Sequence, residues 1–135
     1  MKYISTRNKT LNFDASSAIL QGLSIDKGLF ILENPSDLHV NLEDCLNMNY
    51  QELAYEILSK YLNDFTDEQT RTCISNAYSN TFSSAEITPT VKVKDDYILE
   101  LFHGPTSAFK DVALQILPHL LTTSLKIQGS KEEII

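Results

Sequence analysis

Basic residues and cysteines are both scarce in this sequence. Its 135 residues include 11 lysines and arginines against 18 aspartates and glutamates, which gives a net charge of −7 at pH 7. An acidic chain repels phosphate backbones and anionic lipid surfaces, so we expect neither nucleic acid nor membrane as a partner, and an anionic ligand would need a local positive pocket. The two cysteines, Cys45 and Cys73, lack C-x-x-C spacing and have no histidine at zinc-binding spacing. We therefore predict no metal site and two buried thiols in a reducing compartment.

Long apolar runs are also missing. No stretch approaches the roughly 20 residues that span a bilayer, and residues 1–5, MKYIS, turn polar too early for a signal peptide. With 42% hydrophobic and 21% charged residues, the composition is that of one globular domain. These features predict a cytoplasmic protein.

The first two thirds of the sequence are predicted to be mainly helical. Apolar residues between 50 and 62 recur at the helical period on one face. Thr66 and Gln69 have the spacing of a capping box for a second helix, which would bury Cys73, Ile74, Ala77 and Tyr78. Shorter elements are expected before them: a strand at 3–6, a helix capped by Asp14 and ended by Gly22, a buried strand or an extended segment at 29–32, and a short helix capped by Asn41.

The pattern changes after residue 82 and predicts a β-hairpin followed by a helix. Residues 90–94 alternate with period two, Asp95 and Asp96 mark a turn without the usual glycine, and residues 97–102 form the second strand. A helix is expected to start near Ser107, and Pro118 should kink or end it. Residues 129–135 read as a loop and the start of a buried strand. Because a natural terminus is usually polar, we expect the sequence to be cut inside a longer protein.

The segment that indicates catalytic chemistry is ELFHGPTSAFKD, residues 100–111. It reads as a strand, a tight Gly-Pro turn and the first turn of a helix, where unsatisfied backbone N–H groups favour anions. Lys110 would lie one turn into an apolar helix. Burial and a helix N-terminus both disfavour a protonated amine, and an unprotonated lysine is what Schiff-base chemistry with an aldehyde requires. From spacing alone, a solvated lysine beside Asp111 is the commoner situation.

The string ELFHGPTSAFKDVALQ resembles the cofactor-lysine segment of threonine synthases, whose pattern is ELFHGPTxAFKD. Residues 3–7, YISTR, resemble the opening YxSTR of that family. Residues 18–30 resemble its A-x-x-x-G-L-x-x-D-G-G-L-[FY], with Lys27 in place of the first glycine of the pair. The matches span nearly the whole chain in the family's order. The departure at Lys27 makes the backbone geometry there a test of the resemblance.

The resemblance implies a two-domain α/β enzyme that converts O-phospho-L-homoserine and water into L-threonine and phosphate. Lys110 would hold pyridoxal phosphate covalently and move protons on the substrate carbons. Phe109 could pack on the cofactor ring or fill the core. His103, Thr106 and Ser107 could contact the substrate. The alternatives are a bond to a nearby backbone group for His103 and helix capping for the two hydroxyls.

Other residues are given structural roles. Arg7 is expected to hold a buried ion pair, and Asp111 to balance charge or support the helix start. His39 and His119 lie outside any motif and are interpreted as structural or surface residues.

We therefore expect an α+β, or partial α/β, fold. Region 1–85 would be mainly helical, and region 86–135 would hold the hairpin, the cofactor-lysine helix and the start of a catalytic domain truncated before its main parallel sheet. The family also has a glycine-rich loop for the cofactor phosphate, whereas the four glycines here do not cluster. The chain alone is thus predicted to be inactive. The alternative function is a non-catalytic folding or interaction module, which would self-associate through the exposed strand edge and apolar surface.

Overall fold

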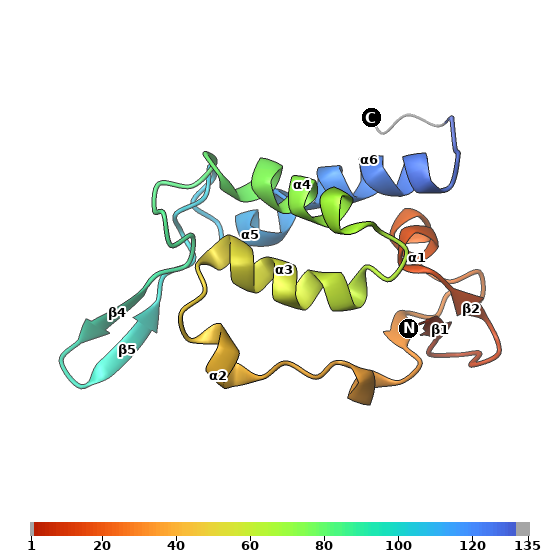
Figure 1. Ribbon diagram of the computed structural model, residues 1–135, viewed down its shortest axis with the longest axis horizontal. Coiled ribbons are helices and arrows are strands. Elements are labelled where there is room, and N and C mark those ends of the chain that lie inside the picture. The colour runs from red at the N-terminus through yellow and green to blue at the C-terminus, as the bar shows by residue number, and fades with distance from the viewer. Residues whose placement is uncertain (1, 132–135) are drawn as a thin grey trace.

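A computed structural model describes residues 2–131 of the chain as a mixed α/β structure. A three-stranded sheet lies at one end, a two-stranded hairpin at the other, and helices run between them (Figure 1). Every described strand pair is antiparallel. The truncation before a parallel sheet and the division after residue 85 stay predictions.

The sheet has the order β2-β1-β3, with β1 (Tyr3–Ser5) between β2 (Asn12–Phe13) and β3 (Phe30–Leu32). The strands predicted at 3–6 and 29–32 are confirmed, and only the two-residue β2 was not foreseen. In β3, Leu32 is buried while Ile31 is exposed, because alternate side chains of a strand face opposite sides of the sheet. The expectation that this whole strand is buried is therefore wrong.

The first helices begin close to the predicted residues. α1 (Ala15–Gln21) follows Asp14 and ends at Gly22, which has a φ of 66°. The expected cap is wrong, because the Asp14 side chain makes no cap hydrogen bond and Asn63 and Asp64 accept from the first two N–H groups of α1 instead. The Asn41 side chain caps α2 (Leu42–Cys45), and complete capping boxes start α3 (Tyr50–Tyr61) and α4 (Asp67–Tyr78). The 3-10 turn η1 (Pro35–Asp37) precedes α2. The box at α3, formed by Asn49 and Glu52, was missed, although its N-x-x-E spacing is visible in the sequence.

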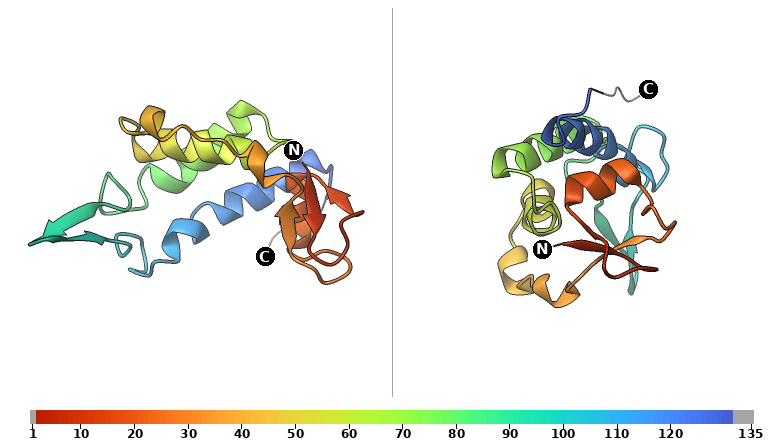
Figure 2. Two further views of the ribbon diagram at one scale, coloured as in Figure 1. Left: turned by 90° about the horizontal axis from the view of Figure 1, so that it is seen from below. Right: turned by 90° about the vertical axis from the view of Figure 1, so that its right-hand side faces the viewer.

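The core forms around α4. This helix contacts α3 on one side and α6 (Leu117–Ile127) on the other, and α6 also packs against α1, as the end-on view of Figure 2 shows. The rings of Tyr50 and Tyr78 meet edge to face with centroids 5.0 Å apart. The buried cluster consists of Cys73, Ile74, Ala77, Tyr78, Ile87 and Ile116. The predicted buried face of α4 is confirmed, whereas the apolar face of α3 is only partly covered.

The region after residue 89 differs from prediction in three places, of which one is that the second strand of the hairpin ends at Leu99 instead of residue 102. The hairpin consists of β4 (Thr90–Val93) and β5 (Asp96–Leu99) and projects from the helices (Figure 2). Because Val93 pairs with Asp96, the turn is Lys94-Asp95, one residue earlier than expected, and Lys94 takes the left-handed φ of 57° that glycine usually supplies. The helix expected from Ser107 begins instead at Asp111, so its predicted start is wrong. The expected break at Pro118 is confirmed, because α5 (Asp111–Leu114) and α6 are separate helices. Pro118 lies in the first turn of α6, where the missing N–H does no harm.

Several smaller expectations are also decided by the structure. Both cysteines are free, but only Cys73 is buried, so the expected burial of Cys45 is wrong. His39 is exposed and His119 half-buried. Among residues 2–131, no helix is both long enough and apolar enough to cross a membrane. The strand expected at the end of the chain falls on residues 132–135, outside the described residues.

Candidate functional site

The Lys110 loop, which we define as residues 103–111, is held by a buried carboxylate. Asp111 is 2% exposed and accepts hydrogen bonds from the Thr106 backbone N–H at 2.8 Å and from the Thr106 hydroxyl at 2.7 Å. The Thr106 hydroxyl is the main cause that holds the pKa of Asp111 below its usual range. Asp111 therefore closes the loop, in agreement with its expected support of the helix start.

Gly104 and Ser107 shape the same loop. A Cβ on Gly104 would lie 2.5 Å from Oδ2 and 2.8 Å from Cγ of Asp111, so no side chain fits there. Ser107 has a left-handed φ of 57°, and its N–H donates to the Gly104 carbonyl at 3.1 Å. This turn delays the start of the helix to Asp111, because a helix cannot continue through a left-handed residue.

Lys110 is exposed and directly precedes α5. The predicted burial is therefore wrong, and the four-residue α5 is too short to build a strong helix dipole. Within residues 2–131 the Lys110 amine makes no ion pair or hydrogen bond. The amine is consequently free to react.

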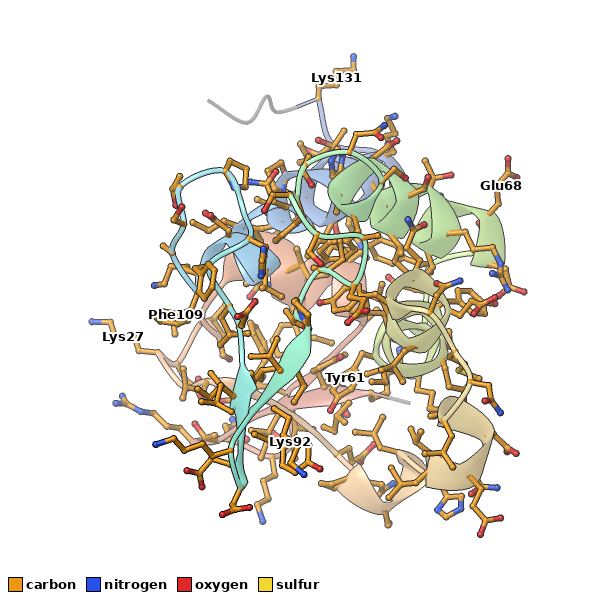
Figure 3. The ribbon with its side chains drawn as sticks, turned by 90° about the vertical axis from the view of Figure 1, so that its left-hand side faces the viewer. Lys27, Tyr61, Glu68, Lys92, Phe109 and Lys131 are labelled. Atoms are coloured by element: carbon orange, nitrogen blue, oxygen red, sulfur yellow. The ribbon has the colours of Figure 1, made fainter. Side chains whose placement is uncertain are left out.

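Phe109 is 69% exposed and lies at the surface of the molecule, as Figure 3 shows. The alternative in which it fills the core is therefore wrong. Because Phe109 is exposed and directly precedes Lys110, its ring is available to a ligand bound at the Lys110 amine.

His103 ties the loop to the segment that follows α4. Its Nε2 lies 2.7 Å from Glu100 Oε2, and its Nδ1 lies 3.1 Å from the Ser83 hydroxyl. The His103 carbonyl accepts from the Ser83 N–H at 2.9 Å, and the imidazole stacks on Phe102. Both ring nitrogens have side-chain partners in this structure, so His103 has a structural role, but its ring contacts two side chains and not the backbone group that was expected.

The two N-terminal motifs meet in one junction. The buried Ser5 hydroxyl donates to Asp26 Oδ1 at 2.7 Å, and the Gly28 N–H donates to the same oxygen at 3.0 Å. The Ser5 hydroxyl is the main cause that lowers the pKa of Asp26. Thr6 adds two bonds to Leu29: its N–H donates to the Leu29 carbonyl, and its hydroxyl accepts from the Leu29 N–H. Sequence reasoning assigned no role to this motif, which joins β1 to the turn before β3.

Arg7 and Lys27 lie at the edge of the junction. Arg7 is exposed and donates to the Asp26 carbonyl at 3.4 Å, so the expected buried ion pair is wrong. Lys27 has a φ of 63°, which explains why glycine suits this position in the resembled pattern. The junction lies by the sheet, away from α5 (Figure 1), so the structure does not bring the N-terminal motifs to the Lys110 loop.

Replacing Lys27 with glycine is expected to raise the free energy of unfolding by about 0.5–1 kcal/mol, because a left-handed side chain is strained and glycine is not. Urea unfolding followed by circular dichroism measures the change. Lys9→Gly is the matched control, since Lys9 is also exposed but has no left-handed φ, and it should be neutral or destabilising. A loss of stability in Lys27→Gly as large as in the control would contradict the strain.

Known proteins resemble this chain in amino-acid sequence. Residues 2–78 match a family model described as threonine synthase N terminus. The chain belongs to the threonine synthase family. It is 37% identical to the threonine synthase of Methylobacillus glycogenes over 100% of this chain and 30% of that protein. It is 39% identical to the threonine synthase of Saccharomyces cerevisiae over 98% of this chain and 29% of that protein.

Two solved threonine synthases share the fold. The PLP-bound enzyme from Brucella melitensis superposes with a TM-score of 0.85 at 33% identity, over 96% of this chain and 28% of that one. The Escherichia coli enzyme superposes with a TM-score of 0.76 at 27% identity, over 96% of this chain and 29% of that one. The chain therefore spans less than a third of the length of these threonine synthases.

Proposed function

We propose that this chain is the part of a threonine synthase that carries the cofactor lysine, Lys110. The whole enzyme would convert O-phospho-L-homoserine and water into L-threonine and phosphate in the cytoplasm, as a step of threonine biosynthesis. One observation carries the proposal: the unpaired, exposed amine of Lys110 lies in a loop whose shape is fixed by Asp111, Thr106 and Gly104. A lysine that forms a covalent link to an aldehyde needs such access and such a fixed position.

The described residues fit one end of pyridoxal phosphate. The Lys110 amine is free, and the exposed Phe109 ring is its neighbour. Both donors of Thr106 are already used by Asp111, so Thr106 offers nothing to a phosphate group without rearrangement. When bound, the cofactor supplies an electron sink for the substrate carbons. Lys110 would hold it and carry protons, and Phe109 would cover the ring.

The three side chains proposed to contact the substrate differ in how many existing hydrogen bonds they would have to break. Ser107 is exposed, so its hydroxyl can reach a ligand directly. His103 would have to release Glu100 or Ser83 first. Thr106 would contact substrate only if Asp111 moved. Ser107 is therefore the strongest candidate of the three.

A graft tests the activity. Residues 1–135 would replace the matched segment of the Methylobacillus glycogenes enzyme, and phosphate release from O-phospho-L-homoserine would be measured. We expect the graft to be active and Lys110→Ala in the graft to lose activity by roughly 10²–10⁴-fold or more, because proton transfer by a positioned group contributes that much. Lys126→Ala, an exposed lysine of α6, is the control and should keep the activity.

The same assay tests our proposal that the 135-residue chain alone is inactive. With pyridoxal phosphate added, the chain should release no phosphate and show no saturable visible absorption band, because its four glycines form no glycine-rich loop for the cofactor phosphate. A strong absorption band that Lys110→Ala abolishes would contradict the proposed inactivity of the 135-residue chain alone. A folded graft that is inactive with Lys110 in place would contradict the proposed function instead.

The second candidate function is an interaction module, and the hairpin favours it. The outer edges of β4 and β5 are unpaired within the described chain, and large apolar side chains are exposed on and after the hairpin. These are Val93, Tyr97, Ile98, Leu99, Phe102 and Phe109. Such a surface would drive self-association. Sedimentation over a wide concentration range discriminates: a strict monomer argues against this candidate.

A further inference from the structure

A cavity of about 430 Å³ opens between the start of α3 and the middle of α4, among residues that the Lys110 loop does not contain. Its walls include the aromatic residues Tyr50, Tyr55 and Tyr78 together with the buried Ile74 and Ile87. The volume lies within the range of small-molecule sites, and the mixture of aromatic rings with a few polar groups is typical of them.

Arg71 gives this cavity a positive charge. Its guanidinium carbon lies 3.5 Å from the centroid of the Tyr55 ring, a stacked arrangement that leaves the in-plane N–H groups free. Asp67 and Glu68 precede Arg71 by one helical turn, yet among the described residues Arg71 forms no ion pair. Figure 3 shows Glu68 projecting away from the helices. A planar, oriented and unpaired guanidinium is the group that proteins use to bind carboxylates.

The cavity wall also contains a strained residue. Ile87 has a φ of 61° although it is β-branched, and it is only 3% exposed. A β-branched residue in the left-handed region is an outlier that the surrounding packing must stabilise, and such residues gather at ligand sites. The strain turns the chain after α4 so that Ile87 closes one wall of the cavity.

We propose that this cavity binds a small carboxylate with an aromatic or planar apolar body, separately from the Lys110 loop. The carboxylate would pair with Arg71, and the body would lie against the tyrosine rings. Arg71 is the local positive group that an acidic chain needs for an anionic ligand. At the rim, Glu52 accepts the Asn49 N–H through Oε2. Its negative charge disfavours a second anionic group on the ligand and favours an ammonium group.

Calorimetric titration of the full 135-residue chain tests the proposal with 3-phenylpropionate as the probe. We expect saturable binding with a Kd on the order of 1 mM or tighter, as one charge-assisted pair and ring contacts allow. Phenethylamine, which has the ring and an ammonium group but no carboxylate for Arg71, should bind at least 10-fold more weakly than 3-phenylpropionate. L-phenylalanine carries both a carboxylate and an ammonium group. If it binds more tightly than 3-phenylpropionate and Glu52→Gln abolishes that gain, Glu52 is the group that binds the ammonium.

The matched variants are Arg71→Gln and Glu68→Gln on the same exposed side of α4. Arg71→Gln should weaken the binding of 3-phenylpropionate at least 10-fold, whereas Glu68→Gln should leave it unchanged. Tyr55→Leu, which removes the ring beneath the guanidinium, should weaken it as well. Equal binding to the wild type and Arg71→Gln, or no saturable binding of 3-phenylpropionate to a wild-type chain shown to be folded by circular dichroism, would overturn the proposal.

Discussion

Replacing Ile74 with alanine is expected to lower the free energy of unfolding by about 3 kcal/mol, the largest effect of any single truncation that we consider. Ile74 is 2% exposed and lies in the cluster where α4 meets α6 and the segment around Ile87. Deleting its outer carbons removes apolar contacts with this cluster and enlarges the cavity that Ile74 lines. Urea unfolding followed by helical circular dichroism measures the loss.

Ile25→Ala is the matched control, since this side chain is 75% exposed and lies outside the core. It should change stability by no more than about 0.5 kcal/mol. If both variants lost the same amount, the cluster around α4 would not be the centre of the fold. A loss in Ile74→Ala accompanied by a smaller dependence on urea concentration would indicate a change in compactness instead.

Sequence reasoning located this core because local signals agreed along α4. The capping box of Thr66 and Gln69 fixes where the helix begins, and the helical period then places Cys73, Ile74 and Ala77 on one face. The same period in α3 predicted a buried face that is only partly covered. Periodicity identifies the side of a helix that prefers burial, but it does not say how much neighbouring structure is there to cover it.

The turns were harder to predict because the sequence uses little glycine. Four other residues take left-handed backbone conformations: Lys27, Ile87, Lys94 and Ser107. Glycine or asparagine at such positions would have marked them as turns. Because serine is not a strong turn signal, the sequence was interpreted as a helix from Ser107, and the loop that sets up Lys110 was missed. Tertiary contacts, above all those of Asp111, decide the conformation there.

The site was therefore predicted only in part. The resemblance of residues 100–111 to a family pattern identified Lys110, while spacing and charge alone left it an ordinary lysine. The structure adds the roles of its neighbours: Asp111 as the buried anchor and Gly104 as the position that must lack a side chain. Neither role can be deduced from the sequence, since both depend on two residues of an irregular loop meeting across it.

Replacing Gly104 with alanine is expected to lower the free energy of unfolding by about 2 kcal/mol and to loosen the Lys110 loop. The added Cβ would lie 2.8 Å from Cγ and 2.5 Å from Oδ2 of Asp111, and even closer to its Cβ. The clash thus involves the base of the Asp111 side chain, which rotation of the carboxylate cannot relieve. Either residue must move, and the two hydrogen bonds from Thr106 to Asp111 would be lost or lengthened.

Gly129→Ala separates this clash from ordinary backbone strain. Gly129 has a φ of 62°, and a Cβ added to it would meet no atom within 4 Å, so alanine there should lose only about 1 kcal/mol from the left-handed conformation. Urea unfolding compares the two variants, and the amide resonance of Thr106 reports its hydrogen bond to Asp111. If Gly104→Ala cost no more than Gly129→Ala and left the Thr106 amide unchanged, Asp111 would not be the anchor of the loop. The fixed position of Lys110, on which the proposed chemistry depends, would then need another cause.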